Sequence, residues 1–158
     1  TAGKRQYNSP RGRMTQTSSI LDPQTPILIV DDSAEFAMVL NRILTGVFGF
    51  KAITILPSTG DALERIHSRP GEFKVLFLDF HLTKSKNGGE LLSTLAEEGL
   101  LQDKIVFLMS SDPTAEALQR VVKAGAAGII TKPFDRDELK RKLERARQLS
   151  EQSGTDSF

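Results

Sequence analysis

Short apolar runs alternate with amphipathic segments five times along this chain, and this alternation constrains the fold more than any other feature. Three runs are unbroken and of strand length, as expected where a parallel strand is buried on both faces. They are residues 27–30, 75–78 and 105–109. Two further runs, 52–56 and 127–131, are interrupted by Thr or Gly, which favours positions nearer the edges of a sheet. The sequence therefore predicts five strands with the three strongest in the middle.

The segments between the strands have the spacing of amphipathic helices. Each would place an apolar stripe against the sheet. The predicted stripes are Phe36, Leu40, Ile43 and Val47; Ala62, Leu63 and Ile66; Leu91, Leu92 and Leu95; and Ala117, Leu118, Val121 and Val122. Asp112-Pro113 and the pair Asp135 and Glu138 mark two helix starts. Right-handed crossovers then predict an α/β fold, a doubly wound five-stranded parallel sheet with helices on both faces. The strand order does not follow from periodicity.

We expect three parts in the chain: a disordered basic leader at 1–25, a folded domain at 26–147 and a polar, frayed tail at 148–158. Up to residue 26 there are four basic residues and one acidic residue, a net charge of +3, so the remainder carries −2 of the total of +1. A basic interaction arm is the alternative for the leader. The charge of the domain gives no indication that it binds nucleic acid.

Composition excludes several classes of chemistry. The chain has no cysteine, which excludes disulfides, thiolate metal sites and cysteine nucleophiles. Its longest apolar runs are too short to cross a bilayer, and no signal-peptide pattern opens the chain. We therefore expect a cytoplasmic protein that does not bind a membrane.

Polar side chains follow four of the five strands. They are Asp31 and Asp32 after the first, Asp79 after the third, Ser110 and Ser111 after the fourth, and Thr131, Lys132 and Pro133 at the end of the fifth. Ligands of open α/β sheets bind beyond the carboxyl ends of the strands, so we expect these groups to converge at one edge. Taken singly, an Asp-Asp pair or a Lys-Pro is more often a turn. Their joint occurrence at separate strand ends favours a reactive site.

Three carboxylates at one edge would repel one another, which is best explained by a bound cation. Mg²⁺ suits carboxylates and phosphate oxygens, whereas zinc would require His or Cys. The histidines are His67 and His81, and we expect both to be solvated loop residues. An Asp could then attack phosphorus, while the metal, Lys132 and Ser110 neutralise the charge of the transferred group.

These stretches resemble the receiver domain of bacterial-type two-component signalling. The resemblance extends from about residue 27 to 147 and is strongest at 27–33, 75–79, 107–111 and 124–134. It implies a flavodoxin-like sheet in the order 2-1-3-4-5. Our assignment of the two weaker strands to the edges agrees with that order.

The resemblance also implies a function, that of a conformational switch in a phosphorelay. Asp79 would be the phosphorylated residue, and Ser110 and Lys132 would hold the phosphoryl oxygens. The Mg²⁺ ligands would be Asp31 (directly or through water), Asp32, Asp79 and the backbone carbonyl of His81. The implied partners are a histidine kinase or histidine phosphotransfer protein and a downstream output protein or fused domain. Such a protein catalyses its own phosphorylation and slow dephosphorylation and is not a dedicated metabolic enzyme.

Three departures from the family pattern concern the response to phosphorylation. Ile129 stands where the family has an aromatic switch residue, so the usual ring rotation cannot operate; a packing role in the core and a modified switch are both open. Thr83 replaces the usual Pro, and the loop 83–87 before Gly88-Gly89 is one residue longer than the common pattern. His81 and Asp112 occupy positions that tune hydrolysis of the acyl phosphate in the family.

Other classes fit less well. A haloacid-dehalogenase-like phosphatase requires Asp-x-Asp, but this chain has Asp79-Phe80-His81. A P-loop nucleotide hydrolase is excluded because the Gly-x-x-x-x-Gly-Lys-Ser/Thr motif does not occur. The remaining alternative is a pseudo-receiver, an interaction module that keeps the fold without phosphorylation. The presence of all five site residues argues against it, but the departure at Ile129 leaves it open.

Overall fold

The computed structural model describes residues 22–81, 88–111 and 127–156, together with 114, 116, 119, 123 and 125, and the side chains up to Leu149. Several expectations lie outside these residues: the leader at 1–21, the loop 83–87, the Asp112-Pro113 cap and the stripe of Ala117, Leu118, Val121 and Val122. Residues 22–25, which we expected in the leader, lie in the described part of the chain and form backbone hydrogen bonds. The N–H of Thr25 donates to the carbonyl of Asp22 in a turn, and that of Lys51 donates to the carbonyl of Pro23.

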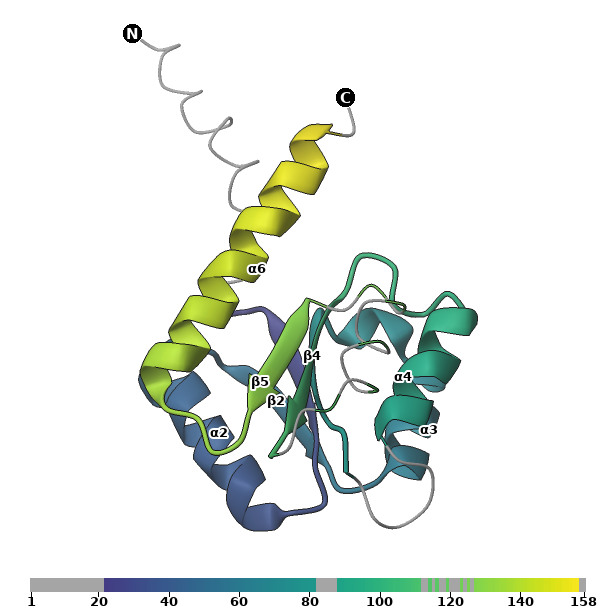
Figure 1. Cartoon of the computed structure of the whole chain (residues 1–158), viewed down its shortest axis with the longest axis horizontal. Coiled ribbons are helices and arrows are strands. Elements are labelled where there is room, and N and C mark those ends of the chain that lie inside the picture. Colours follow the sequence, from purple (N-terminus) through teal and green to yellow (C-terminus); the bar gives the residue numbers. More distant parts are fainter. Residues whose placement is uncertain are drawn as a thin grey trace, which may run out of the picture.

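Five parallel strands form one sheet in the order β2-β1-β3-β4-β5 (Figure 1). The strands are β1 (Pro26–Val30), β2 (Ala52–Leu56), β3 (Val75–Asp79), β4 (Ile105–Ser110) and β5 (Gly128–Thr131). Every residue of β3 and β4 is buried, whereas most residues of β2 and β5 are partly exposed. The predicted fold class, the strand order and the assignment of the two weaker strands to the edges are confirmed.

Helices cover both faces of the sheet. They are α2 (Ala34–Gly46), α3 (Thr59–Ser68), α4 (Gly88–Glu97) and α6 (Arg136–Asp156), with a short 3-10 helix, η1 (Pro70–Glu72), between α3 and β3. Buried residues of α2 and α6 pack with one face of the strands in a first core cluster that includes Phe77 and Phe107. Residues of α3 and α4 pack with the other face in a second cluster. This two-sided burial makes the fold doubly wound.

The buried face of α2 differs from the predicted stripe. Ala37, Leu40 and Leu44 are buried, whereas Val47 lies just after the helix and is 47% exposed. The prediction was wrong for Val47 because the helix ends at Gly46, so the 3.6-residue spacing no longer applies there. The stripes on the next two helices are confirmed: Ala62 and Ile66 are buried, Leu63 is partly buried, and Leu91, Leu92 and Leu95 are buried.

The last helix is longer than we expected. The carboxylate of Asp135 accepts the N–H of Glu138 at 2.9 Å and caps its start, as the sequence predicts. Leu139, Leu143 and Ala146 bury its first turns against the sheet. The helix then continues past residue 147 to Asp156 and extends away from the sheet (Figure 1). Among the described helices, none combines the length and the apolar character that a membrane span requires.

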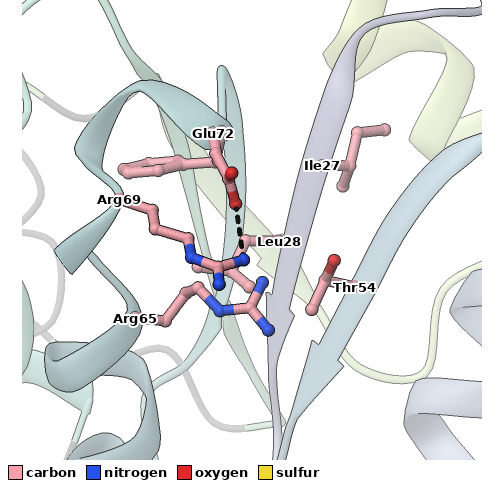
Figure 2. A pocket seen from close by; sticks show the side chains of 7 residues that line it. Ile27, Leu28, Thr54, Arg65, Arg69 and Glu72 are labelled. Carbon is pink, nitrogen blue, oxygen red and sulfur yellow. Dashed lines mark hydrogen bonds and ion pairs between the residues drawn. The ribbon is translucent and has the colours of Figure 1, made fainter.

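A small pocket lies at the end of the sheet opposite to the polar residues. It is lined by Ile27, Leu28, Thr54, Arg65, Arg69, Glu72 and Phe73 (Figure 2). Arg69 and Glu72 form an exposed ion pair of 3.5 Å beside it. Because Ile27 and Leu28 precede the carboxyl end of β1, the pocket is separate from the groups that follow the strands.

Candidate functional site

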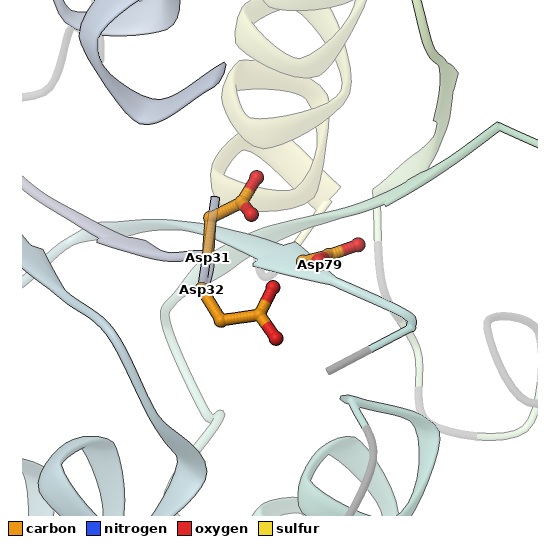
Figure 3. Close-up of side chains that lie close together, drawn as sticks. All are labelled: Asp31, Asp32 and Asp79. Carbon is orange, nitrogen blue, oxygen red and sulfur yellow. The ribbon is translucent and has the colours of Figure 1, made fainter. Parts of the chain in front are cut away.

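Three carboxylates meet beyond the carboxyl ends of β1 and β3 (Figure 3). Val30 pairs with Leu78 in the parallel register, so Asp31, which follows Val30, lies beside Asp79 at the end of β3. Asp32 is the next residue along the chain. A carboxylate oxygen from each of the three Asp residues lies within 4.8 Å of the others. We call this group the carboxylate cluster; the sequence predicted it, and the structure brings the three residues together.

The carboxylate of Asp31 is held at both oxygens and is only 2% exposed as a residue. One oxygen accepts the N–H of Ser33 at 2.9 Å, and the other accepts a hydrogen bond from the ammonium of Lys132 at 2.9 Å. The Ser33 hydroxyl in turn accepts the N–H of Phe36 and caps α2. The turn after β1 therefore orients Asp31 and begins the helix at the same time.

Lys132 reaches the carboxylate cluster from the end of β5. Its ammonium is 3.4 Å from Asp79 Oδ1 as well as 2.9 Å from Asp31, and its side chain is 12% exposed. Its backbone N–H donates to the carbonyl of Ser110 at 2.8 Å, which joins the ends of β4 and β5. One ammonium thus contacts two buried carboxylates. We expected Lys132 to reach this edge from its position after the fifth strand.

The electrostatics of the cluster favour a further cation. Burial raises the pKa of Asp79 above its ordinary value of 3.8, and the charge of Asp31 raises it further. Lys132 and the His81 N–H lower the pKa but do not cancel these effects. The ionised carboxylates therefore lack positive charge, and a divalent ion would supply it.

The donor set fits Mg²⁺. Among the described residues, the cluster consists of aspartate oxygens only, and oxygen ligands are those that Mg²⁺ prefers. Neither imidazole belongs to the cluster. His67 lies 2.7 Å from Glu98, and the ring of His81 contacts Ser110. A zinc site would have required such imidazole donors.

Ser110 and His81 form a contact that the sequence did not predict. Ser110 ends β4 and is fully buried, and its hydroxyl lies 3.1 Å from Nε2 of His81. The N–H of His81 donates to Asp79 Oδ1 at 3.2 Å, and its ring meets the Phe80 ring edge-on. His81 is exposed and follows a strand, as expected, but it is bonded to a site residue rather than only solvated. The expectation for His67 was wrong, because it lies on α3 and not in a loop.

Gly88 is a second residue of the site that sequence reasoning missed. Its N–H donates to the carbonyl of Phe80 at 3.1 Å. A Cβ atom at this position would lie only 1.9 Å from the carbonyl oxygen of Asp79. The first residue of α4 can therefore approach the end of β3 only if it has no side chain. The Gly88-Gly89 pair before the Leu-rich stripe was the available signal.

Ile129 is partly buried and packs against the second core cluster, on the sheet face that α3 and α4 cover. This matches the packing role among the two possibilities that the sequence left open. The contact between Lys132 and the ring of Phe36 was not predicted either.

Several known proteins are similar to this chain in sequence. The chemotaxis protein CheY of Pseudomonas aeruginosa is 27% identical over 119 residues, which cover 75% of this chain and 93% of that protein. The transcriptional regulatory protein ZraR of Salmonella typhimurium is 27% identical over 131 residues. These cover 82% of this chain but 28% of ZraR, so the chain spans little more than a quarter of that relative's length.

Solved structures share the fold. A CheY-like receiver domain protein from Methanospirillum hungatei superposes with a TM-score of 0.70 at 24% identity, covering 82% of this chain and 98% of that one. CheY in the CheX-CheY-BeF3-Mg+2 complex from Borrelia burgdorferi gives a TM-score of 0.67 at 24% identity, over 75% of this chain and 86% of that one.

The family model for the response regulator receiver domain matches residues 27–144. That range contains the whole sheet from its second residue on, the carboxylate cluster, Ser110 and Lys132. The resemblance seen in the sequence is therefore confirmed: this chain belongs to the response regulator receiver domain family.

Proposed function

We propose that this domain is a phosphoryl-accepting switch of a phosphorelay, phosphorylated on Asp79 with the help of Mg²⁺. The observation that carries the proposal is the carboxylate cluster with Lys132. Two buried aspartates share one ammonium, and an oxygen of the third aspartate lies within 4.8 Å of theirs, close enough for all three to share a metal ion. A purely structural ion pair would not require three carboxylates.

We infer the role of each side chain from its contacts. Asp79 Oδ1 accepts a hydrogen bond from the His81 N–H and lies near Lys132, so Oδ2 is the oxygen that we propose attacks phosphorus. A bond then forms between this oxygen and phosphorus, while the bond from phosphorus to the donor's leaving group breaks. Lys132 would pair with a phosphoryl oxygen, because its ammonium already lies beside the nucleophile.

Ser110 would donate its hydroxyl proton in a hydrogen bond to a second phosphoryl oxygen. That hydroxyl lies 3.1 Å from Nε2 of His81, so it is already positioned at the end of β4. Asp31, Asp32, Asp79 and the backbone carbonyl of His81 would hold Mg²⁺, which when bound offsets the negative charge of the carboxylates and of the incoming phosphoryl group. The Asp31 carboxylate is already oriented, since both of its oxygens accept hydrogen bonds.

Partners follow from the same chemistry. We infer that a histidine kinase or a histidine phosphotransfer protein supplies the phosphoryl group in the cytoplasm, and that an output protein or a fused domain reads the result. The Borrelia burgdorferi complex contains CheY together with BeF3 and Mg+2, and this supports a phosphoryl site in a protein of the same fold. Phosphorylation of Asp79 would shift the population of the domain from one side-chain packing to another.

The test is phosphorylation by acetyl phosphate, read by intact mass, with Mg²⁺ and with EDTA. We expect the parent to gain one phosphoryl group only with Mg²⁺, and Asp79→Asn to gain none. Asp61→Asn is the matched control, because Asp61 is an exposed carboxylate in the first turn of α3; it should react like the parent. The same adduct on Asp79→Asn would contradict the assignment.

A pseudo-receiver remains the second candidate, and Ile129 favours it because a partly buried isoleucine, packed against the second core cluster, offers no ring for the family's switch. An interaction module of this kind would show no Mg²⁺-dependent adduct in the parent protein. The acetyl phosphate experiment therefore separates the two functions. If the adduct forms without any change in the amide NMR spectrum, the domain has kept the phosphorylation reaction but has lost the conformational response to it.

A further inference from the structure

Lys132 has a third contact besides the two carboxylates. Its ammonium lies 4.1 Å from the centre of the Phe36 ring, within the range of a cation–π interaction. The side chain is mostly shielded from water, at 12% exposure. Such contacts are stronger where the cation is desolvated than on an open surface. The ring is therefore part of what fixes the ammonium in this site.

Phe36 is itself held from two sides. Its N–H donates to the Ser33 hydroxyl in the helix cap, two residues after Asp31, so the ring and the Asp31 carboxylate belong to the same turn. On the other side, its ring packs on Phe134 with centroids 5.3 Å apart. Phe134 follows Lys132 by two residues and packs against the first core cluster. Phe36 thus joins the start of α2 to the segment that carries Lys132.

The ring contact differs from the carboxylate contacts in one respect. A divalent cation in the carboxylate cluster would compete with Lys132 for the oxygens of Asp31 and Asp79, and its charge would repel the ammonium. The face of Phe36 is not a ligand for Mg²⁺. The aromatic contact would therefore persist when the carboxylates turn to the metal, and it would keep the ammonium beside Asp79.

We propose that Phe36 is a positioning residue for Lys132, whose ring keeps the ammonium in place to bind phosphoryl oxygens once Mg²⁺ occupies the carboxylate cluster. This rests on the proposed function. Phe36 touches neither the metal nor the phosphoryl group in this scheme and acts only through Lys132.

The first test compares phosphorylation by acetyl phosphate and binding of beryllofluoride, both with saturating Mg²⁺. Phe36→Leu keeps an apolar side chain but removes the ring, and we expect both quantities to fall by about three- to tenfold. The Mg²⁺ dissociation constant should change by less than about twofold, because the three carboxylates are untouched. Phe36→Tyr keeps the aromatic face and should restore most of the activity.

Phe48→Leu is the matched control. Phe48 packs against the first core cluster and pairs with another ring, that of Phe50 at 6.1 Å, just after the end of the same helix. Phe48→Leu therefore removes a ring and its packing without a change near Lys132. Equal loss of phosphorylation in Phe36→Leu and Phe48→Leu would overturn the proposal, since packing alone would then explain it. Failure of Phe36→Tyr to recover would overturn it as well.

A second readout does not depend on phosphorylation. A ring above an ammonium shifts the NMR signals of the neighbouring Lys132 Cε protons upfield, and we expect this shift in the parent and in Phe36→Tyr but not in Phe36→Leu. It should persist when Mg²⁺ is added. Loss of the shift with Mg²⁺ would overturn the positioning role even if phosphorylation proceeds. A parent that keeps the shift but never forms an adduct would instead contradict the proposed function.

Discussion

Asp79 is a buried carboxylate whose ionised form is disfavoured by its surroundings. Burial and Asp31 raise its pKa above 3.8, the ordinary value. The folded protein therefore binds this proton more tightly than the unfolded chain does, and ionisation of Asp79 costs stability at every pH above the folded pKa. The cost is relieved as the pH falls through that pKa. The contribution of Asp79 to the free energy of unfolding therefore changes with pH in the opposite direction to that of an aspartate stabilised by a salt bridge.

We therefore predict that Asp79→Asn stabilises the protein in the absence of divalent ions. At pH 7 this gain should appear as a higher unfolding midpoint for Asp79→Asn than for the parent. It should shrink as the pH falls through the folded pKa, because the parent carboxylate becomes neutral there. Thermal unfolding of both proteins in EDTA, from pH 7 downward, measures the difference. A less stable Asp79→Asn at pH 7 would mean that Lys132 outweighs burial and Asp31.

At the residue scale, the site could be predicted where chemistry follows directly from position along a strand. Asp31, Asp79 and Lys132 each follow an apolar run, so a parallel sheet brings them to one edge whatever their rotamers. The contacts of His81 with Ser110 and of Phe36 with Lys132 depend on side-chain directions across separate elements. Neither strand nor helix periodicity contains that information.

At the scale of elements, the close approach of α4 to β3 is decided by one glycine. We predict that Gly88→Ala displaces the end of β3, because the new Cβ would lie 1.9 Å from the Asp79 carbonyl oxygen, and backbone must move to relieve this contact. Overpacking of this kind costs about 1–3 kcal/mol. Since Asp79 moves with its carbonyl, Mg²⁺ affinity should fall by about tenfold or more. Denaturant unfolding and Mg²⁺ titration measure the two effects.

Gly60→Ala is the control for this substitution. Gly60 lies in the first turn of α3, and the nearest atom to its Cβ would be 4.0 Å away. Alanine has the higher helix propensity, so this variant should be as stable as the parent or slightly more stable, with unchanged Mg²⁺ affinity. If Gly88→Ala also left Mg²⁺ affinity unchanged, the approach of α4 would not position Asp79.

Element ends were harder to predict than the elements themselves. The strand positions follow from the apolar runs and were correct to within one residue at each end. The predicted buried face of α2 differed from the observed one because the apolar spacing continues to Val47, whereas the helix ends at Gly46. The last helix continues beyond residue 147 because Gln and Leu there are good helix formers, although little apolar surface remains to bury. Polarity alone was a poor guide to where this helix ends.

For the whole molecule, the position of the site links separate parts of the fold. Asp31 and Asp32 follow β1, Asp79 ends β3 and Lys132 follows β5, so the groups around the carboxylate cluster come from the centre and one edge of the sheet. The unfolded chain does not bring these separate strand ends together. A ligand of the cluster therefore binds the folded state only, and its binding free energy adds to the stability of the entire domain.

This coupling predicts that Mg²⁺ raises the free energy of unfolding of the parent, by about 2.7 kcal/mol at 100 times its dissociation constant. Asp32→Asn should lose most of this gain, because it removes one carboxylate of the cluster while Asp31 and Asp79 keep their contacts with Lys132. Glu98→Gln is the control, since it removes an exposed carboxylate paired with His67, outside the cluster. Thermal or denaturant unfolding across an Mg²⁺ series gives the comparison. Equal gains in Asp32→Asn and the parent would place the ion elsewhere, and the linkage between metal binding and the sheet would then have to be abandoned.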